Sequence, residues 1–214
     1  MAYLSLDRSP SGPHVSQNTK NMGRDEKSRW NKKYEEASPG FWEPEPFLVD
    51  AYSEFVAGLP AGDALDLAGG SGRNALWLAQ RGWRVRLVDI SEAGVALAVE
   101  RARGFSPEAR GSVTTDVLDL SSVRSLGHER YDLILVFFYL QRNLFPALIQ
   151  ALKPGGILMY QTFTTGQRSL IGGPRGPAYL LNPNELREAF QALQILHYRE
   201  STGLKSLAEL VARK

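Results

Sequence analysis

The sequence contains no cysteine and only three histidines among its 214 residues. Without cysteine there is no disulfide, no thiolate metal site, no iron–sulfur cluster and no cysteine nucleophile. His14, His128 and His197 lie far apart in the sequence, so no two of them have the spacing of metal ligands. The sequence therefore predicts no metal site, and any chemistry must come from other groups.

Long apolar runs are missing as well. No stretch approaches the roughly 18 to 20 apolar residues needed to cross a bilayer, and the amino terminus lacks the apolar core of a signal peptide. We therefore expect a cytoplasmic protein that does not associate with membranes.

An excess of positive charge is missing from the body of the chain. The net charge is +2, but residues 1–33 hold seven Lys or Arg against three acidic residues, which leaves eighteen against twenty for the remainder. A body that is close to neutral lacks the basic surface that follows a phosphate backbone. The composition therefore argues against nucleic acid as a partner.

The length suits one domain with a core of ordinary size. Residues 1–23 show no apolar periodicity and contain several Pro and Gly residues, so we expect a disordered tail. Residues 24–214 form the expected domain, and residues 24–60 form its amino-terminal helical cover. Within the cover, helices are predicted at residues 25–34 and about 46–58, with a turn at residues 38–40.

After Gly62, short apolar runs alternate with helical segments, the pattern of parallel strands joined by crossover helices. Strands are expected at residues 64–68, 85–89, 112–118, 131–137 and 157–162, and helices at 73–80, after the capping residue Ser91, at 144–152 and at 182–192. Residues 195–198 and 206–212 then predict two strands joined by a loop of about eight residues, too short for a parallel crossover. We therefore predict an α/β, Rossmann-like, doubly wound seven-stranded sheet that is mostly parallel with an antiparallel last strand.

A glycine-rich turn follows the first of these strands and reads Asp66-Leu67-Ala68-Gly69-Gly70-Ser71-Gly72. Glycine lets the backbone approach a ligand closely, and the free amides at a helix start favour an anionic group. The turn is therefore a candidate cofactor site at the carboxyl end of a strand. The alternative interpretation is a tight strand-to-helix turn without a ligand.

Asp89 ends the second strand about twenty residues after the glycines, where an acidic side chain can accept hydrogen bonds from both ribose hydroxyls. Enzymes that use NAD and enzymes that use S-adenosylmethionine (SAM) share this device. A helix-capping aspartate is the alternative. Three features favour SAM: the terminal hairpin, the pattern Asp-x-Ala-x-Gly-x-Gly, and the charge of Asp66, which can bind an ammonium but would repel a pyrophosphate.

With these residues the chain resembles the class I SAM-dependent methyltransferases, especially the small-molecule group similar to tellurite-resistance and thiopurine methyltransferases. The resemblance covers about residues 30–214 and is carried by residues 66–74, 85–91, 117–120 and 131–162, including the turn Leu152-Lys153-Pro154-Gly155-Gly156. The chain departs from the family pattern at Ala68, where the family often has its first glycine.

The resemblance implies roles for residues that the patterns alone do not assign. An acidic residue after the third strand commonly meets the adenine amine, which points to Asp119 and Leu120, with Asp116 as the competing choice. Trp30 and Tyr34 match a Trp-x-x-x-Tyr segment that folds over the cofactor, although packing against the sheet is the alternative. The expected SAM-binding residues are Trp30, Tyr34, Asp66, Ala68, Gly69, Gly70, Gly72, Asn74, Asp89, Ile90, Asp119, Leu120 and Phe137.

The ends of the fourth and fifth strands should face the substrate. Phe137 or Phe138 can place an aromatic face beside a sulfonium, and at least one of the two is expected in the core. The candidate substrate residues are Tyr139, Gln141, Arg142, Gln161 and Thr164, of which Arg142 could attract an anion or lie at a helix start on the surface. The glycine-containing segment 165–181 is a candidate substrate lid, or else a surface loop.

We therefore expect SAM as cofactor, S-adenosylhomocysteine as product, and direct in-line methyl transfer to a small molecule by a monomer or homodimer. No catalytic residue is required, because rate can come from alignment and desolvation, and Tyr139 is the candidate if the acceptor must lose a proton. Two alternatives remain open at this point. One is an NAD(P)-dependent oxidoreductase, and the other is a SAM-binding protein without turnover.

Overall fold

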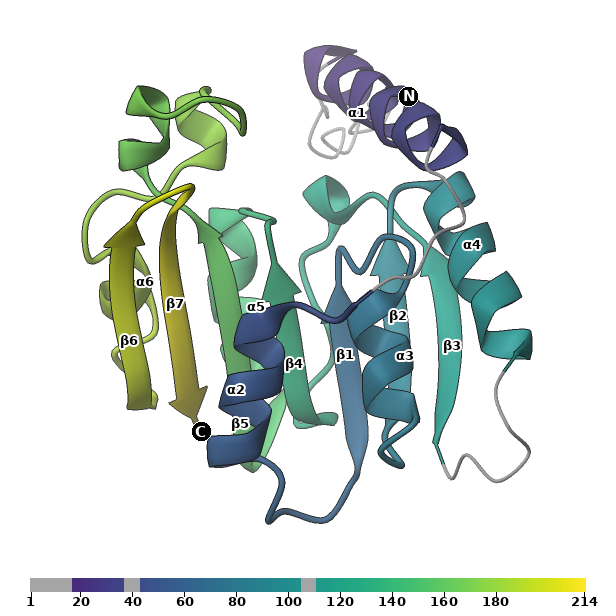
Figure 1. Cartoon of the computed structure of the whole chain (residues 1–214), viewed down its shortest axis with the longest axis vertical. Helices are drawn as coiled ribbons and strands as arrows, with labels where there is room; N and C mark the ends of the chain where they lie inside the picture. The colour runs from purple at the N-terminus through teal and green to yellow at the C-terminus, as the bar shows by residue number, and fades with distance from the viewer. Residues whose placement is uncertain (1–16, 37–42, 105–110) are drawn as a thin grey trace, which may run out of the picture.

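A seven-stranded sheet with the order β3-β2-β1-β4-β5-β7-β6 forms the centre of the computed structural model (Figure 1). The structure describes residues 17–36, 43–104 and 111–214. The strands are β1 (Asp63–Leu67), β2 (Arg84–Asp89), β3 (Ser112–Val117), β4 (Tyr131–Phe137), β5 (Leu152–Phe163), β6 (Gln194–Thr202) and β7 (Ser206–Arg213). The first five are parallel, and β7 runs antiparallel to both β5 and β6. This confirms the predicted fold class.

Helices cover both faces of the sheet. They are α1 (Gln17–Glu35), α2 (Pro46–Phe55), α3 (Arg73–Ala79), α4 (Glu92–Arg103), α5 (Phe145–Ala151) and α6 (Glu185–Ala189), with short 3-10 helices η1 (Leu120–Ser122), η2 (Arg142–Leu144), η3 (Thr165–Ser169) and η4 (Pro177–Tyr179). In the described residues no helix is long and apolar enough to cross a membrane.

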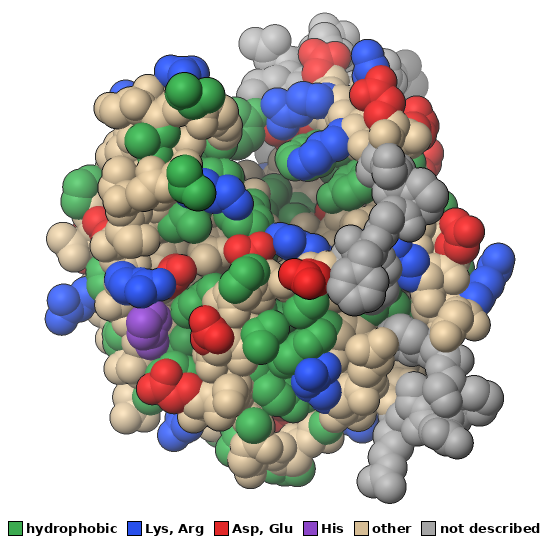
Figure 2. Space-filling view, viewed as in Figure 1, with side chains coloured by type: hydrophobic (Ala, Val, Ile, Leu, Met, Phe, Trp, Pro, Cys, Tyr) green, Lys and Arg blue, Asp and Glu red, His purple; other side chains and the backbone are tan. Residues whose placement is uncertain are grey.

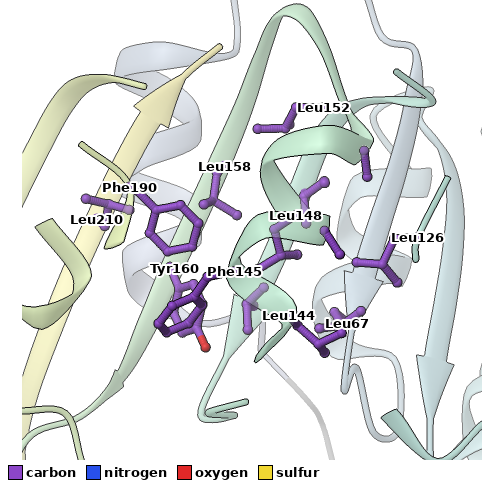
Figure 3. Packing of buried hydrophobic residues seen from close by; sticks show 14 of the residues in the cluster. Leu67, Leu126, Leu144, Phe145, Leu148, Leu152, Leu158, Tyr160, Phe190 and Leu210 are labelled. Atoms are coloured by element: carbon purple, nitrogen blue, oxygen red, sulfur yellow. The ribbon is translucent and has the colours of Figure 1, made fainter. Parts of the chain in front are cut away.

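Two apolar cores lie on the two faces of the sheet. One contains residues of α2, α3 and α4, and the other contains residues of α5 and α6. Figure 3 shows the second core, in which Phe145 and Leu148 of α5 point towards the sheet residues Leu158 and Tyr160. The central strand β4 is fully buried from Leu133 to Val136, because it meets a core on each face. This explains why its sequence is continuously apolar rather than alternating.

The strand order reverses between β1 and β4, since β1 pairs with β2 on one side and with β4 on the other. In open α/β sheets ligands bind in the crevice outside the carboxyl ends of the strands at such a point. Helix α1 lies beyond this edge of the sheet and packs against α4 (Figure 1). The fold therefore brings the glycine-rich turn, the end of β4 and the amino-terminal helix to one place.

Several predicted boundaries are wrong. Helix α1 begins at Gln17, so residues 17–23 are helical rather than part of a tail, because their only strong helix breaker is Gly23 and a single glycine costs about 1 kcal/mol in a helix. Residues 1–16 and the turn predicted at residues 38–40 lie outside the described residues. Helix α6 ends at Ala189, earlier than the predicted residue 192.

The end of the sheet also differs from its prediction. Strand β5 begins at Leu152, so the turn predicted at Lys153-Pro154-Gly155-Gly156 is part of a strand, with a register shift opposite Tyr131 and Leu133. The backbone amide of Gly155 donates to Lys214 (2.7 Å), and that of Lys214 donates to Gly156 (3.0 Å), so the carboxyl terminus pairs with this segment, in which Gly155 keeps a left-handed φ of 79°. Strand β6 runs to Thr202, and the connection to β7 is shorter than predicted.

Candidate functional site

The glycine-rich turn between β1 and α3 has a backbone that favours glycine. Gly70 and Gly72 have φ angles of 56° and 81°, and Ala68 has a φ of 57°. A Cβ atom on Gly69 would lie 2.7 Å from Oδ2 of Asp66, so this position has no room for a side chain. Ala68 is the costly residue, since a left-handed conformation costs an ordinary residue about 1–2 kcal/mol. The turn therefore keeps the shape that a glycine at position 68 would adopt without strain.

Asp66 lies inside the turn and only 1% of it is exposed. Its Oδ2 accepts a hydrogen bond from the backbone amide of Ala75 (3.1 Å), which ties the end of β1 to the first turn of α3. Burial raises the pKa of Asp66 from 3.8 to about 7, partly opposed by the Ala75 amide, and the nearby charge of Asp89 raises it further. Asp66 therefore stabilises the glycine-rich turn from inside the protein. A contact between Asp66 and the ammonium of the methionine part of SAM stays a prediction.

Asp89 connects the glycine-rich turn with the start of α4 at the predicted adenosine site. Its Oδ2 accepts from the backbone amide of Gly70 (2.8 Å) and its Oδ1 accepts from that of Ser91 (2.8 Å). Ser91 itself is the cap of α4, because its hydroxyl accepts from the amide of Gly94 (3.0 Å). The amide of Ile90 also donates to this carboxylate, and since a carboxylate has about four lone-pair positions, one remains for a ribose hydroxyl. Burial raises the pKa of Asp89, while the backbone donors oppose this shift.

Helix α1 places Tyr34 directly on the glycine-rich turn. A Cβ atom on Gly70 would lie 2.0 Å from the hydroxyl of Tyr34, and one on Gly94 would lie 2.9 Å from its ring. Trp30 stacks on Tyr34, with ring centroids 6.1 Å apart. Burial raises the pKa of Tyr34, and Asp89 raises it further, so its hydroxyl stays protonated and available as a donor. The segment thus covers the turn, as the Trp-x-x-x-Tyr pattern predicted, whereas cofactor contact stays a prediction.

Two residues that the sequence reasoning missed hold α1 in place. Asn31 accepts through Oδ1 from the hydroxyl of Ser91 (2.8 Å) and from the amide of Ala93 (3.3 Å), so it caps α4 from another helix. Lys27 donates to Glu92 (2.6 Å) at the same end of α4. The spacing of residues 27, 31 and 34 puts these contacts on one helical face. This helical spacing was the sequence feature from which Lys27 and Asn31 could have been predicted.

Positive charge gathers at the edge of the turn. Arg73 donates to Glu45 (2.5 Å), whereas Lys33 has no acidic partner among the residues that the structure describes. The Lys33 ammonium lies 4.3 Å from the centroid of the Trp30 ring. Burial lowers the pKa of Lys33, and the charges of Arg29 and Arg73 lower it further. This cation is therefore stabilised by any anion that reaches it.

Asn74 has a structural contact that the sequence did not predict. It is buried, and its Oδ1 accepts from the backbone amide of Glu45 (2.9 Å), which fixes the start of α2 beside α3. This acceptor is therefore used inside the protein. A cofactor contact by Asn74 would have to come through its amide nitrogen.

The predicted adenine residues lie after β3. Asp119 caps η1 by accepting from the amide of Ser121 (2.9 Å), and Leu120 is buried with 4% exposed. The competing candidate Asp116 forms an ion pair with Arg86 (2.6 Å), which occupies its carboxylate. Among the two candidates, Asp119 is therefore the one that lies in the turn after the strand. Ile90, next to Asp89, is half-buried.

Tyr139 follows the end of β4 and is half-buried. Burial raises its pKa, and the charges of Glu26, Asp119 and Asp89 raise it further. A raised pKa makes a phenol harder to deprotonate. The structure therefore argues against Tyr139 as a general base.

The two phenylalanines at the end of β4 have different surroundings. Phe137 is 6% exposed and packs in the core against Phe47, with ring centroids 6.2 Å apart, and its contact with the cofactor stays a prediction. Phe138 has a φ of 56°, and its amide donates to the carbonyl of Gln161 (2.8 Å). Phe138 is partly buried at the margin of this core, and its ring packs against Phe163 (5.4 Å between centroids).

Three predicted substrate residues make structural contacts, although Oε1 of Gln161 is buried without a hydrogen-bond partner among the described residues. Arg142 pairs with Glu185 and donates to the carbonyl of Leu180 (2.9 Å), so it ties η2 to the segment before α6 and is not free for an anion. Gln161 is buried on β5 and donates through Nε2 to Glu209 (3.0 Å). Thr164 is buried and shares a hydrogen bond with Ser206 (2.7 Å between hydroxyl oxygens). Gln141 is half-buried at the start of η2.

Two cations that lie beside Phe138 were missed. The guanidinium of Arg73 is 5.9 Å and the ammonium of Lys205 is 4.9 Å from the centroid of this ring. Lys205 comes from the connection between β6 and β7, which no local motif marks. Figure 2 shows the molecule hollowed between α1 and the lobe that contains residues 165–181, with blue Lys and Arg side chains at the edge of the hollow.

The segment 165–181 is held firmly at its base. Gln167 is 1% exposed, accepts from the amide of Ser206 (2.9 Å) and donates to the carbonyl of Gly172 (3.0 Å). The amide of Leu181 donates to the carbonyl of Phe163 (2.9 Å).

Among the described residues no group of three or more His, Asp or Glu could hold a metal ion.

Comparison with known proteins gives a family match. The sequence model of the family described as tellurite resistance protein TehB matches residues 48–209. The chain is 29% identical over 157 residues to Hemagglutinin 1 of Eikenella corrodens, covering 70% of this chain and 49% of that protein. It is 28% identical over 147 residues to the probable S-adenosyl-L-methionine-dependent methyltransferase TehB of Haemophilus influenzae, covering 65% of this chain and 48% of that protein. The chain spans about half the length of these curated relatives.

Among solved structures, the fold is similar to that of magnesium protoporphyrin IX methyltransferase (ChlM) from Synechocystis PCC 6803 with bound SAM. The TM-score is 0.65 at 20% sequence identity, and the match covers 94% of this chain and 100% of that chain. At this identity the likeness concerns the fold alone. It agrees with the predicted sheet, including the antiparallel terminal pair.

Proposed function

Because the chain belongs to the tellurite resistance protein TehB family, we propose that it binds SAM at the glycine-rich turn and transfers the methyl group to a small molecule. The family match confirms the resemblance to class I SAM-dependent methyltransferases. The observation that carries the proposal for this chain is the direct contact between Asp89 and Gly70, with Tyr34 above the same glycine. An acidic strand end, a glycine-rich turn and an aromatic cover thus meet at the crevice.

The charges around the turn fit the methionine part of SAM, which carries an ammonium and a carboxylate. Lys33 lacks an acidic partner among the described residues and has a lowered pKa, so a carboxylate beside it and Arg73 would relieve an unfavourable charge arrangement. Asp66 is the buried carboxylate of the turn and would complement the ammonium. Asp89 would accept from a ribose hydroxyl, with Asp119 and Leu120 on the adenine side.

The residues of the chain would act mainly by positioning. When bound, SAM supplies a methyl group on a sulfonium that is already activated for direct transfer to a nucleophile. Tyr34 and Trp30 would exclude water above the turn, and Phe138 offers an aromatic face at the end of β4. Tyr139 would stay protonated and donate a hydrogen bond instead of acting as a base, because its pKa is raised. Alignment and desolvation therefore carry the rate, without a dedicated general base.

The acceptor would enter beside Phe138. Arg73 and Lys205 flank this ring, so an acceptor with an anionic group would meet complementary charge there. These two cations take the part that the sequence analysis gave to Arg142. The cytoplasmic location and the monomeric or homodimeric state stay predictions.

Calorimetry with SAM, S-adenosylhomocysteine and NAD tests the proposal, followed by an acceptor screen that measures S-adenosylhomocysteine release. We expect binding of the first two ligands and release of S-adenosylhomocysteine with at least one acceptor. Binding of NAD alone would identify an oxidoreductase and contradict the proposal. Tight SAM binding without release in a broad screen would identify a SAM-binding protein without turnover.

A further inference from the structure

Helix α1 and the segment 165–181 meet across the crevice at Tyr179. The hydroxyl of Tyr179 in η4 donates to Oε1 of Glu26 (2.8 Å). The guanidinium of Arg29 lies 5.9 Å from the centroid of the Tyr179 ring and 3.6 Å from Glu26. Figure 1 shows α1 and the 3-10 helices of this segment beyond the same edge of the sheet, on opposite sides of the hollow in Figure 2.

The two elements that this contact joins, α1 and the segment 165–181, cover different parts of the site. Through Tyr34, α1 covers the glycine-rich turn. Through Gln167, the segment is fixed to Ser206, next to Lys205 on the substrate side. Glu26 also lies near Tyr139, whose pKa its charge raises after the larger effect of burial. The contact between Glu26 and Tyr179 therefore links the two covers of the crevice.

Specific polar and aromatic contacts hold α1 in place, and this hydrogen bond is one of them. The helix is polar around its circumference, and such helices depend on specific contacts rather than on an apolar stripe. The anchors at the α4 end are Lys27, Asn31 and Tyr34. Glu26 is joined to a different element of the fold, so it restrains the helix from the opposite side of the crevice.

We propose that Glu26 and Tyr179 are positioning residues that hold α1 closed over the cofactor, and that their hydrogen bond opens each time the cofactor is exchanged. This inference rests on the proposed function, because it needs a cofactor beneath α1. Neither residue takes part in methyl transfer. Their contact sets how fast S-adenosylhomocysteine leaves and how well α1 stays in place between turnovers.

The test compares Tyr179→Phe and Glu26→Ala with the wild type, since the first change removes the donor and the second removes the acceptor of the hydrogen bond. Stopped-flow tryptophan fluorescence would follow S-adenosylhomocysteine release, since Trp30 lies on α1. We expect release to be roughly two- to tenfold faster in Tyr179→Phe, the effect of losing one hydrogen bond of ordinary strength. The double variant should be no faster than the faster single variant, because both changes remove one interaction. Hydrogen exchange of residues 25–36 should accelerate in the same variants.

Tyr198→Phe is the matched control. The Tyr198 hydroxyl also donates to a glutamate, Glu200, but on β6 and away from α1. This control should leave release and the exchange of residues 25–36 unchanged. The inference is overturned if the Tyr179 and Glu26 variants fold and match the wild type in both S-adenosylhomocysteine release and hydrogen exchange. Failure of the wild type to bind SAM or S-adenosylhomocysteine would instead overturn the proposed function on which it rests.

Discussion

Replacing Asp66 with Asn should change how the stability of the ligand-free protein depends on pH. Asp66 is 1% exposed, and its pKa rises from 3.8 to about 7 in the fold. A carboxyl whose pKa is raised by folding does not lower the free energy of unfolding at a pH below its pKa in the unfolded chain. Above that pH it lowers the free energy of unfolding increasingly, until the pH passes its pKa in the folded protein. With about 1.36 kcal/mol per pKa unit, the full cost above pH 7 is about 4 kcal/mol.

Urea unfolding of the wild type and of Asp66→Asn at pH 5 and pH 8 measures this cost. The amide keeps an acceptor for the Ala75 backbone but carries no charge. Between the two pH values, the difference in unfolding free energy between variant and wild type should shift by about 2.6 kcal/mol in favour of the variant. Asp50→Asn, an exposed carboxylate on α2, is the control and should show no such shift. Parallel pH profiles for Asp66→Asn and the wild type would refute the reasoning.

Three further predictions concern the site. Asp89→Ala should weaken SAM binding by roughly ten- to a hundredfold in calorimetry, with an unchanged circular dichroism spectrum, and unchanged affinity would contradict the ribose assignment. Gly70→Ala should lower both melting temperature and SAM affinity, because its Cβ would lie 2.0 Å from the Tyr34 hydroxyl, and an undisturbed protein would contradict that packing. Arg142→Ala should lower the melting temperature with little change in acceptor KM, since its partner is Glu185, whereas a KM effect alone would restore it to the substrate site.

The sequence alone determined the fold class and the parts of the cofactor site that are local in the chain. Apolar runs and helical periodicity depend on nearby residues, so strands such as β4 were located to the residue. The glycine-rich turn and the acidic end of β2 belong to one βαβ unit, whose geometry follows from its strand and helix lengths. The short connection before β7 was enough to predict an antiparallel pair, because a crossover needs more residues.

Only the tertiary structure decided which polar groups are free. Arg142 resembles a substrate residue until Glu185, 43 residues later in the chain, pairs with it. Phe137 and Phe138 are equivalent in sequence, but Phe137 is buried in the core, whereas Phe138, with a left-handed φ, is partly buried with Arg73 and Lys205 beside its ring. The contact of Glu26 with Tyr179 joins residues 153 positions apart. Burial and pairing depend on segments that are distant in the chain, and local sequence patterns carry no information about such distances.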